Sequence, residues 1–139
     1  MASLQPPAPQ ACPVVEHPII AESFTIIPFE NGSAELSFNA RRNIDGWEAV
    51  VRSQRFPARI ELTGNADRVG SRRANLRLSL RRAGAIRDYL VGHGFPRDRI
   101  SVRGTGEDQL AIETADGVPE PQNRVVWFQM VTDEREPLC

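Results

Sequence analysis

The pattern of apolar and polar residues along the chain, with its β-prone runs, predicts four short strands. Residues 59–64 alternate charged or polar side chains with Ile60 and Leu62, as expected for a strand that is covered on one face. Pro28 marks a strand end or a sheet edge, because proline cannot donate to a neighbouring strand. The other three predicted strands are residues 24–29, 100–103 and 125–128.

A first helix is predicted between the first two strands. Ile44, Trp47 and Val51 recur there at helical spacing. Asn39 precedes them and has a side chain suited to cap the first turn, so we predict that the helix begins at Asn39.

The main helix is predicted to begin at a Ser79 cap and to run to about Val91, after a short helical turn over residues 71–76. Gly92 and Gly94 stop it, since glycine favours the backbone conformation in which helices end.

The main helix carries an arginine on its apolar face. The residues that share this face with Arg82 are Leu78, Ile86, Tyr89 and Leu90. A guanidinium on the buried side needs a partner, because a buried charge left without one costs about 3–5 kcal/mol. The nearest preceding carboxylate is Asp67, just beyond a predicted strand, so we predict a charged pocket formed by Asp67 and Arg82. A buried ion pair that only orders the strand-to-helix turn is the alternative.

The predicted order βαβαββ indicates an α+β fold. Two main helices on one face of a mixed four-stranded sheet make a two-layer α/β sandwich. Residues 1–20 are rich in proline and are expected to form a tail or linker, residues 21–132 the domain, and residues 133–139 a C-terminal tail. Between the last two strands, residues 104–123 form a long loop of the kind that often carries function. Gly104-x-Gly106 is expected to be a turn, because no helix follows it.

Composition narrows the function classes. With 139 residues, 40% hydrophobic and 25% charged, the chain fits one globular domain. Its net charge of −1 argues against a dedicated nucleic-acid binder. The arginines of residues 68–87 suit a solvated helix face. Aromatic residues that could stack on nucleic-acid bases are few and are not interleaved with these arginines. No transmembrane segment or export signal is visible in the sequence.

We predict no metal site and no cofactor, because the two cysteines and two histidines are scattered along the chain without ligand spacing. Cys12 and Cys139 lie in the two predicted tails, where an exported domain could join them in a disulfide, and the sequence leaves this pairing open. Lipidation of Cys12 ranks lower, because no hydrophobic segment precedes it.

Several spaced motifs occur together over residues 24–130. They are Phe29-Glu30-Asn31-Gly32-Ser33-Ala34-Glu35-Leu36, Gly64-Asn65-Ala66-Asp67-Arg68-Val69-Gly70, Asn75, Leu78-Ser79, Arg82-Ala83, Tyr89-Leu90, Gly104-Thr105-Gly106-Glu107 and Pro121-Gln122-Asn123-Arg124-Val125. As a set they resemble the OmpA-like domain of bacterial envelope proteins, the type found in OmpA, Pal and MotB. Two positions depart from the family pattern: Ala66 replaces the usual threonine, and Val125 replaces a second arginine.

The resemblance implies a site for the diaminopimelate residue of peptidoglycan. Within the family pattern, Asp67 and Arg82 match the two residues that contact diaminopimelate, and Asn75 matches a position that lines the site. Asn31 in the first loop and Arg124 in the last motif are further candidates. The free end of diaminopimelate carries an ammonium and a carboxylate, so Asp67 would accept from the first and Arg82 would pair with the second. Asn75 could equally cap a turn.

The resemblance also implies a non-catalytic domain that anchors the cell envelope to the wall. Its expected partner is peptidoglycan of the diaminopimelate type, without nucleic acid. Its expected location is periplasmic and outer-membrane associated, with membrane contact only through an anchor or partner that the chain does not reveal. Two alternatives remain: an enzyme acting on peptidoglycan through loop carboxylates, and an envelope protein-interaction module that does not bind the wall.

Overall fold

The computed structural model describes residues 21–53, 58–108 and 110–132. The predicted tails, with Cys12 and Cys139, lie outside the described residues. The elements are β1 (Ala21–Pro28), α1 (Phe38–Arg52), β2 (Ala58–Asn65), α2 (Arg72–Gly92), β3 (Ile100–Gly106) and β4 (Val125–Thr132). Short 3-10 turns at Arg97–Arg99 and Pro121–Asn123 precede β3 and β4. The predicted βαβαββ order is confirmed.

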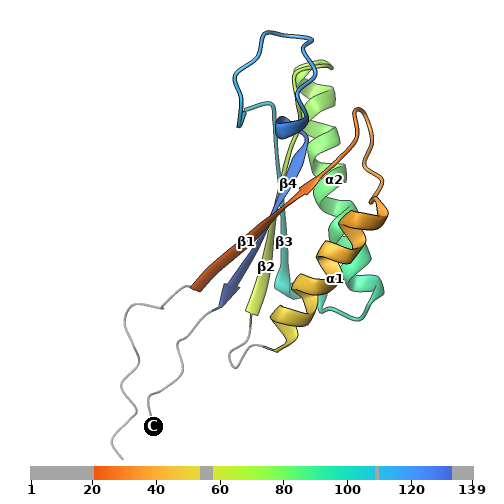
Figure 1. The fold of residues 1–139 in the computed structure, drawn as a ribbon, viewed down its shortest axis with the longest axis vertical. Helices are drawn as coiled ribbons and strands as arrows, with labels where there is room; N and C mark the ends of the chain where they lie inside the picture. The colour runs from red at the N-terminus through yellow and green to blue at the C-terminus, as the bar shows by residue number, and fades with distance from the viewer. Residues whose placement is uncertain (1–20, 54–57, 109, 133–139) are drawn as a thin grey trace, which may run out of the picture.

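The four strands form one mixed sheet in the order β1-β4-β2-β3. β4 pairs antiparallel with both β1 and β2, whereas β2 and β3 are parallel. Both helices cover the same face of this sheet, as Figure 1 shows. The predicted two-layer sandwich is therefore confirmed, and β1, which ends at Pro28, is an edge strand as expected. Neither α1 nor α2 is long and apolar enough to span a membrane.

The core lies between the sheet and the two helices. Its fully buried residues include Ile27 in β1, Ile44 in α1, Ile86 in α2 and Phe128 in β4. Trp47 of α1 packs on Phe128 with 6.3 Å between the ring centroids. Apolar side chains on alternate strand positions and on one stripe of each helix thus meet in a single layer.

Helix α1 begins one residue before the predicted cap. Ser37 is its N-cap, and the Ser37 hydroxyl accepts a hydrogen bond from the backbone N–H of Ala40 at 3.0 Å. The assignment of Asn39 as the cap was therefore wrong. Serine and asparagine cap helices about equally well, so residue type alone could not place the first turn.

Helix α2 is a single helix of 21 residues, and the predicted start at Ser79 was wrong. The cap is Ser71, whose hydroxyl accepts from the backbone N–H of Ala74 at 3.2 Å. Ser79 lies inside the helix, fully buried, and its hydroxyl donates to the carbonyl of Leu76 at 2.7 Å. The predicted end is confirmed, because α2 stops at Gly92.

Glycines let α2 lie close against the sheet. A Cβ atom on Gly64 of β2 would stand 1.9 Å from the carbonyl oxygen of Ser79, and one on Gly104 would stand 2.6 Å from Leu80. Gly106 has a φ of 57°, which favours glycine. The expectation of a turn at Gly104-x-Gly106 was wrong, because both glycines belong to β3 and serve this close packing.

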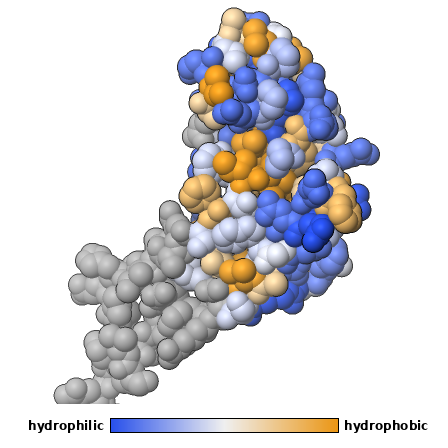
Figure 2. Space-filling view, viewed as in Figure 1, coloured by the Kyte–Doolittle hydropathy of each residue, from blue (hydrophilic) through white to orange (hydrophobic). Residues whose placement is uncertain are grey.

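Hydrophobic residues at the surface are dispersed. Figure 2 shows them as separate patches among hydrophilic residues on the face in view. The exposed large hydrophobic residues come from several elements and include Phe24, Phe38, Val69, Leu80 and Val118.

Candidate functional site

Three connections meet at one end of the sheet. β1, β2 and β3 run in the same direction, so their carboxyl ends and the start of β4 lie together. Figure 1 shows the β1–α1, β2–α2 and β3–β4 connections at this end of the molecule. The sequence-predicted residues Asn31, Asp67, Asn75 and Arg124 lie on or beside these connections, and Arg82 reaches them from α2.

Arg82 is fully buried and binds backbone carbonyls. Its Nε donates to the carbonyl of Ser33 at 2.8 Å, and its two terminal nitrogens donate to those of Asn65 at 3.2 Å and Glu30 at 3.0 Å. Its guanidinium also lies 5.5 Å from the ring centroid of Phe29. The side chain therefore ties the β1–α1 connection to the end of β2.

Asp67, which is 3% exposed, makes its ion pair with Arg124. Its Oδ2 accepts from Nη1 of Arg124 at 3.0 Å and from the backbone N–H of Glu120 at 3.2 Å. Nε of Arg124 donates to the carbonyl of Phe29 at 3.2 Å. Asp67 thus joins the β2 exit to the last part of the β3–β4 connection.

The predicted direct pairing of Asp67 with Arg82 was wrong. The Arg82 guanidinium is hydrogen-bonded to three backbone carbonyls, and the Asp67 carboxylate forms its ion pair with Arg124. The two groups still interact through space. Burial lowers the pKa of Arg82 to about 10, and the nearby Asp67 carboxylate acts in the opposite direction and raises it. Arg82 therefore remains a cation at neutral pH.

Asn75 and Asn31 hold different positions. Asn75 is buried, and its amide donates to the carbonyl of Gly70 at 3.0 Å and to the Glu107 carboxylate at 2.8 Å. It therefore joins the start of α2 to the end of β3. Asn31 is exposed in a turn closed by a hydrogen bond from the Ser33 N–H to the Glu30 carbonyl at 3.1 Å.

The β3–β4 connection is held over the site by side chains that sequence reasoning did not select. Nη1 of Arg68 donates to the carbonyl of Thr114 at 3.0 Å, and its other terminal nitrogen pairs with Asp116. Fully buried Asn123 exchanges two hydrogen bonds with the backbone of Ile112, at 2.9 and 2.8 Å. Asn123 stands next to Arg124 inside the Pro121–Val125 motif, and this was the available signal for it. Nothing in the sequence linked Arg68 to Thr114 or Asp116.

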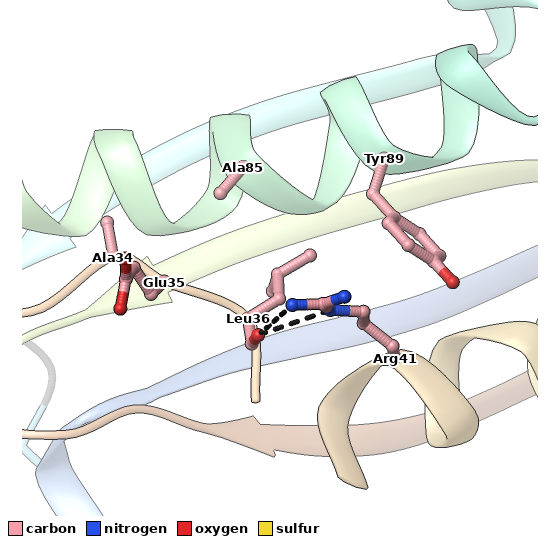
Figure 3. A pocket seen from close by; sticks show the side chains of 6 residues that line it. All are labelled: Ala34, Glu35, Leu36, Arg41, Ala85 and Tyr89. Atoms are coloured by element: carbon pink, nitrogen blue, oxygen red, sulfur yellow. Dashed lines mark hydrogen bonds between the residues drawn. The ribbon is translucent and has the colours of Figure 1, made fainter. Parts of the chain in front are cut away.

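A hollow of about 410 Å³ adjoins the site, and Figure 3 shows its lining. Ala34 follows Ser33 in the chain, and Ala85 lies one turn of α2 beyond Arg82. The remaining lining residues are Glu35, Leu36, Arg41 and Tyr89. A carboxylate and a guanidinium therefore stand beside the loop that Arg82 holds.

Comparisons with known proteins agree with this architecture. Residues 28–124 match the model of the OmpA family. Outer membrane protein A of Yersinia pseudotuberculosis is 34% identical over 122 residues, which cover 84% of this chain and 33% of the relative. Outer membrane protein P5 of Haemophilus influenzae is 33% identical over 101 residues, covering 70% of this chain and 28% of the relative. The chain thus spans about a third of the length of these curated relatives.

A solved structure shares the fold. The peptidoglycan-associated lipoprotein from Burkholderia pseudomallei superposes with a TM-score of 0.68 at 21% identity, covering 76% of this chain and 88% of that one.

Proposed function

Because the chain belongs to the OmpA family, we propose that it is a peptidoglycan-binding domain that anchors the cell envelope to the wall. Family membership confirms the resemblance seen in the sequence and the expectation of a non-enzymatic domain. It also supports a periplasmic, outer-membrane-associated location, in keeping with the outer membrane proteins among its relatives. The peptidoglycan-associated lipoprotein that shares its fold supports the wall as the partner.

The proposed ligand is the diaminopimelate residue of the stem peptide, with Asp67 and Arg82 as its main contacts. The observation that supports this assignment is the convergence of one buried carboxylate and two buried guanidinium groups where three connections meet. A ligand end that bears both an ammonium and a carboxylate complements such a set of charges. Asn75, Asn31 and Arg124 line the same end of the sheet.

Both central groups keep bonding capacity for a ligand. A guanidinium has five N–H donors, and the carbonyls of Ser33, Asn65 and Glu30 occupy three of those of Arg82. The contacts of Asp67 within the described residues all run to Oδ2, which leaves Oδ1 for the ligand ammonium.

Ligand entry requires a local rearrangement, because Asp67 is 3% exposed and Arg82 is fully buried. The longer of the two contacts of Asp67 is the hydrogen bond from the Glu120 N–H at 3.2 Å, so we propose that the β3–β4 connection moves away from Asp67 to admit the ligand. A small charged ligand offers little apolar area, so a single site should bind weakly, and many sites on the wall compensate.

Calorimetry with a soluble stem peptide tests this proposal. The ligand is L-Ala-D-γ-Glu-diaminopimelate, and the control peptide carries lysine in place of diaminopimelate and so lacks the terminal carboxylate. We expect the wild-type domain to prefer the diaminopimelate peptide at least tenfold, about 1.4 kcal/mol. Asp67→Asn and Arg82→Lys should each remove this preference.

Asp88→Asn is the matched control, since Asp88 is an exposed carboxylate on α2. Circular dichroism and urea unfolding establish that each variant is folded at the assay temperature. Equal binding of the two peptides by the wild type would refute diaminopimelate recognition. Absence of binding to whole peptidoglycan sacculi as well would refute wall binding.

A further inference from the structure

The outward side of α2 carries a row of arginines. Arg73, Arg77 and Arg81 are exposed and recur one turn apart. None of them makes an ion pair within the part of the chain that the structure describes. Helix α2 contains six arginines and only one acidic residue, Asp88, although the whole chain has a net charge of −1. Positive charge is therefore concentrated on one helix.

This row is unfavourable for the helix itself. Like charges one turn apart destabilise a helix by about 0.2–0.5 kcal/mol per pair. The first turn of α2 has no acidic residue and holds Arg72 and Arg73, although the helix dipole favours negative charge there. The charge of Arg72 is balanced by an ion pair with Asp108 at 2.7 Å. The charges of Arg73, Arg77 and Arg81 are not balanced by an ion pair within the described residues. Such an arrangement is expected where an external anion supplies the compensation.

Apolar surface lies between the arginines. A hollow of about 490 Å³ is lined by Ala74, Arg77, Leu80 and Arg81. A second, of about 440 Å³, shares Leu80 and Arg81, reaches Val102 of β3, and is also lined by Arg87 and Asp88, which pair with each other at 3.1 Å. Leu80 is 42% exposed. The two hollows form a basic groove, defined here as the surface lined by Ala74, Arg77, Leu80, Arg81 and Val102.

We propose that the basic groove docks an acidic segment of a partner protein, one that inserts an apolar side chain beside Leu80. Carboxylates on either side of that side chain would form forked hydrogen bonds with Arg77 and Arg81. Apolar lining favours a protein over a glycan, and the lack of aromatic residues in the groove argues against stacked nucleic-acid bases. Arg82 is fully buried beneath α2, whereas Arg77 and Arg81 are exposed, so the groove uses a different surface of the helix from the proposed wall site.

The test uses a labelled helical peptide with glutamates flanking two leucines one turn apart. Fluorescence anisotropy gives the affinity, and amide shifts in ¹⁵N spectra of the domain locate the contact. We expect binding that weakens at least tenfold in the Arg77→Glu/Arg81→Glu variant and at least fivefold when the peptide leucines are replaced by serine. Arg97→Glu/Arg99→Glu, on exposed arginines away from α2, is the matched control and should bind as the wild type does.

Each outcome bears on the groove. Equal binding of the leucine and serine peptides would mean that only charge is sensed, and would overturn the proposal. Phosphatidylglycerol vesicles that bind while the peptide does not would overturn it in favour of a membrane surface. Stem-peptide binding is measured in the same variants. Loss of stem-peptide binding in Arg77→Glu/Arg81→Glu would mean that the groove and the wall site are one surface. If this variant still binds the stem peptide but no longer binds the acidic peptide, the two surfaces are separate.

Discussion

The buried stripe of α2 is polar in its first half and apolar in its second. Asn75, Ser79 and Arg82 face the sheet near the loops, and Ile86 and Leu90 face it near the other end. All five are at most 3% exposed. The same helix thus builds two environments, a hydrogen-bonded one where three connections meet and an apolar one that shares the core with Ile44 of α1. Burial alone therefore does not identify the stabilising part of this molecule.

The two halves differ in how they contribute to stability. Burying Ile86 or Leu90 removes apolar surface from water, which stabilises by about 1.5–3 kcal/mol per side chain. Hydrogen bonds of Ser79 and Arg82 mainly replace bonds to water, so each adds only about 1 kcal/mol net. Their loss is costly, however, because it leaves buried carbonyls and N–H groups without partners. The polar half specifies the arrangement of the loops, and the apolar half supplies the free energy.

The largest expected effect is the loss of stability when Arg82 is truncated, and truncation of Leu90 is its comparison. Arg82→Ala should lower the free energy of unfolding by about 3–5 kcal/mol, because the carbonyls of Ser33 and Asn65 lose their donor. Leu90→Ala should cost about 2–5 kcal/mol by leaving a cavity. Urea unfolding measures both. Amide exchange of residues 30–33 should accelerate selectively in Arg82→Ala, and equal acceleration in Leu90→Ala would contradict the division between the halves.

A smaller effect is expected at the contact between the polar half and the sheet. Gly64→Ala places a methyl group against the Ser79 carbonyl and should destabilise by about 1–3 kcal/mol or more. Gly46 is the matched control: it lies in α1, and a Cβ there would meet no atom within 4 Å apart from the neighbouring backbone of its own helix. Gly46→Ala should stabilise by about 0.5–1 kcal/mol. Thermal unfolding of both variants gives the signs, and a stable Gly64→Ala would disprove the close approach.

The smallest effect concerns Tyr89, a polar group in the apolar half that remains at the surface. Its hydroxyl donates to Asp45 at 2.8 Å, and this hydrogen bond raises its pKa above 10.0. The bond is therefore intact below pH 10 and is lost as the pH rises through the raised pKa. Because Tyr89 is the only tyrosine, absorbance at 295 nm follows it alone. Asp45→Ala should lower the pKa, and an unchanged titration would exclude Asp45 as the cause.

Local sequence determined the elements of this protein. Residue periodicity, together with β-prone runs, predicted four strands, two helices and the buried stripe of Arg82, because side-chain burial follows the 2.0 and 3.6 residue repeats. It also placed Asp67 at the end of β2 and Pro28 at the end of β1. The start at Ser37 was missed because Asn39, which caps equally well, stands two residues away, and the start at Ser71 because Ser79, two turns further on, is also a residue that suits a cap.

Only the tertiary structure decided the partners of the charged groups. Asp67 pairs with Arg124 rather than with Arg82, and Arg82 binds the carbonyls of two connections. Nearness in sequence suggested the first partner, but the sheet order places β4 beside β2 and brings Arg124 to Asp67. Backbone carbonyls carry no sequence signature, so no pattern of residue types could reveal them as ligands of a buried guanidinium.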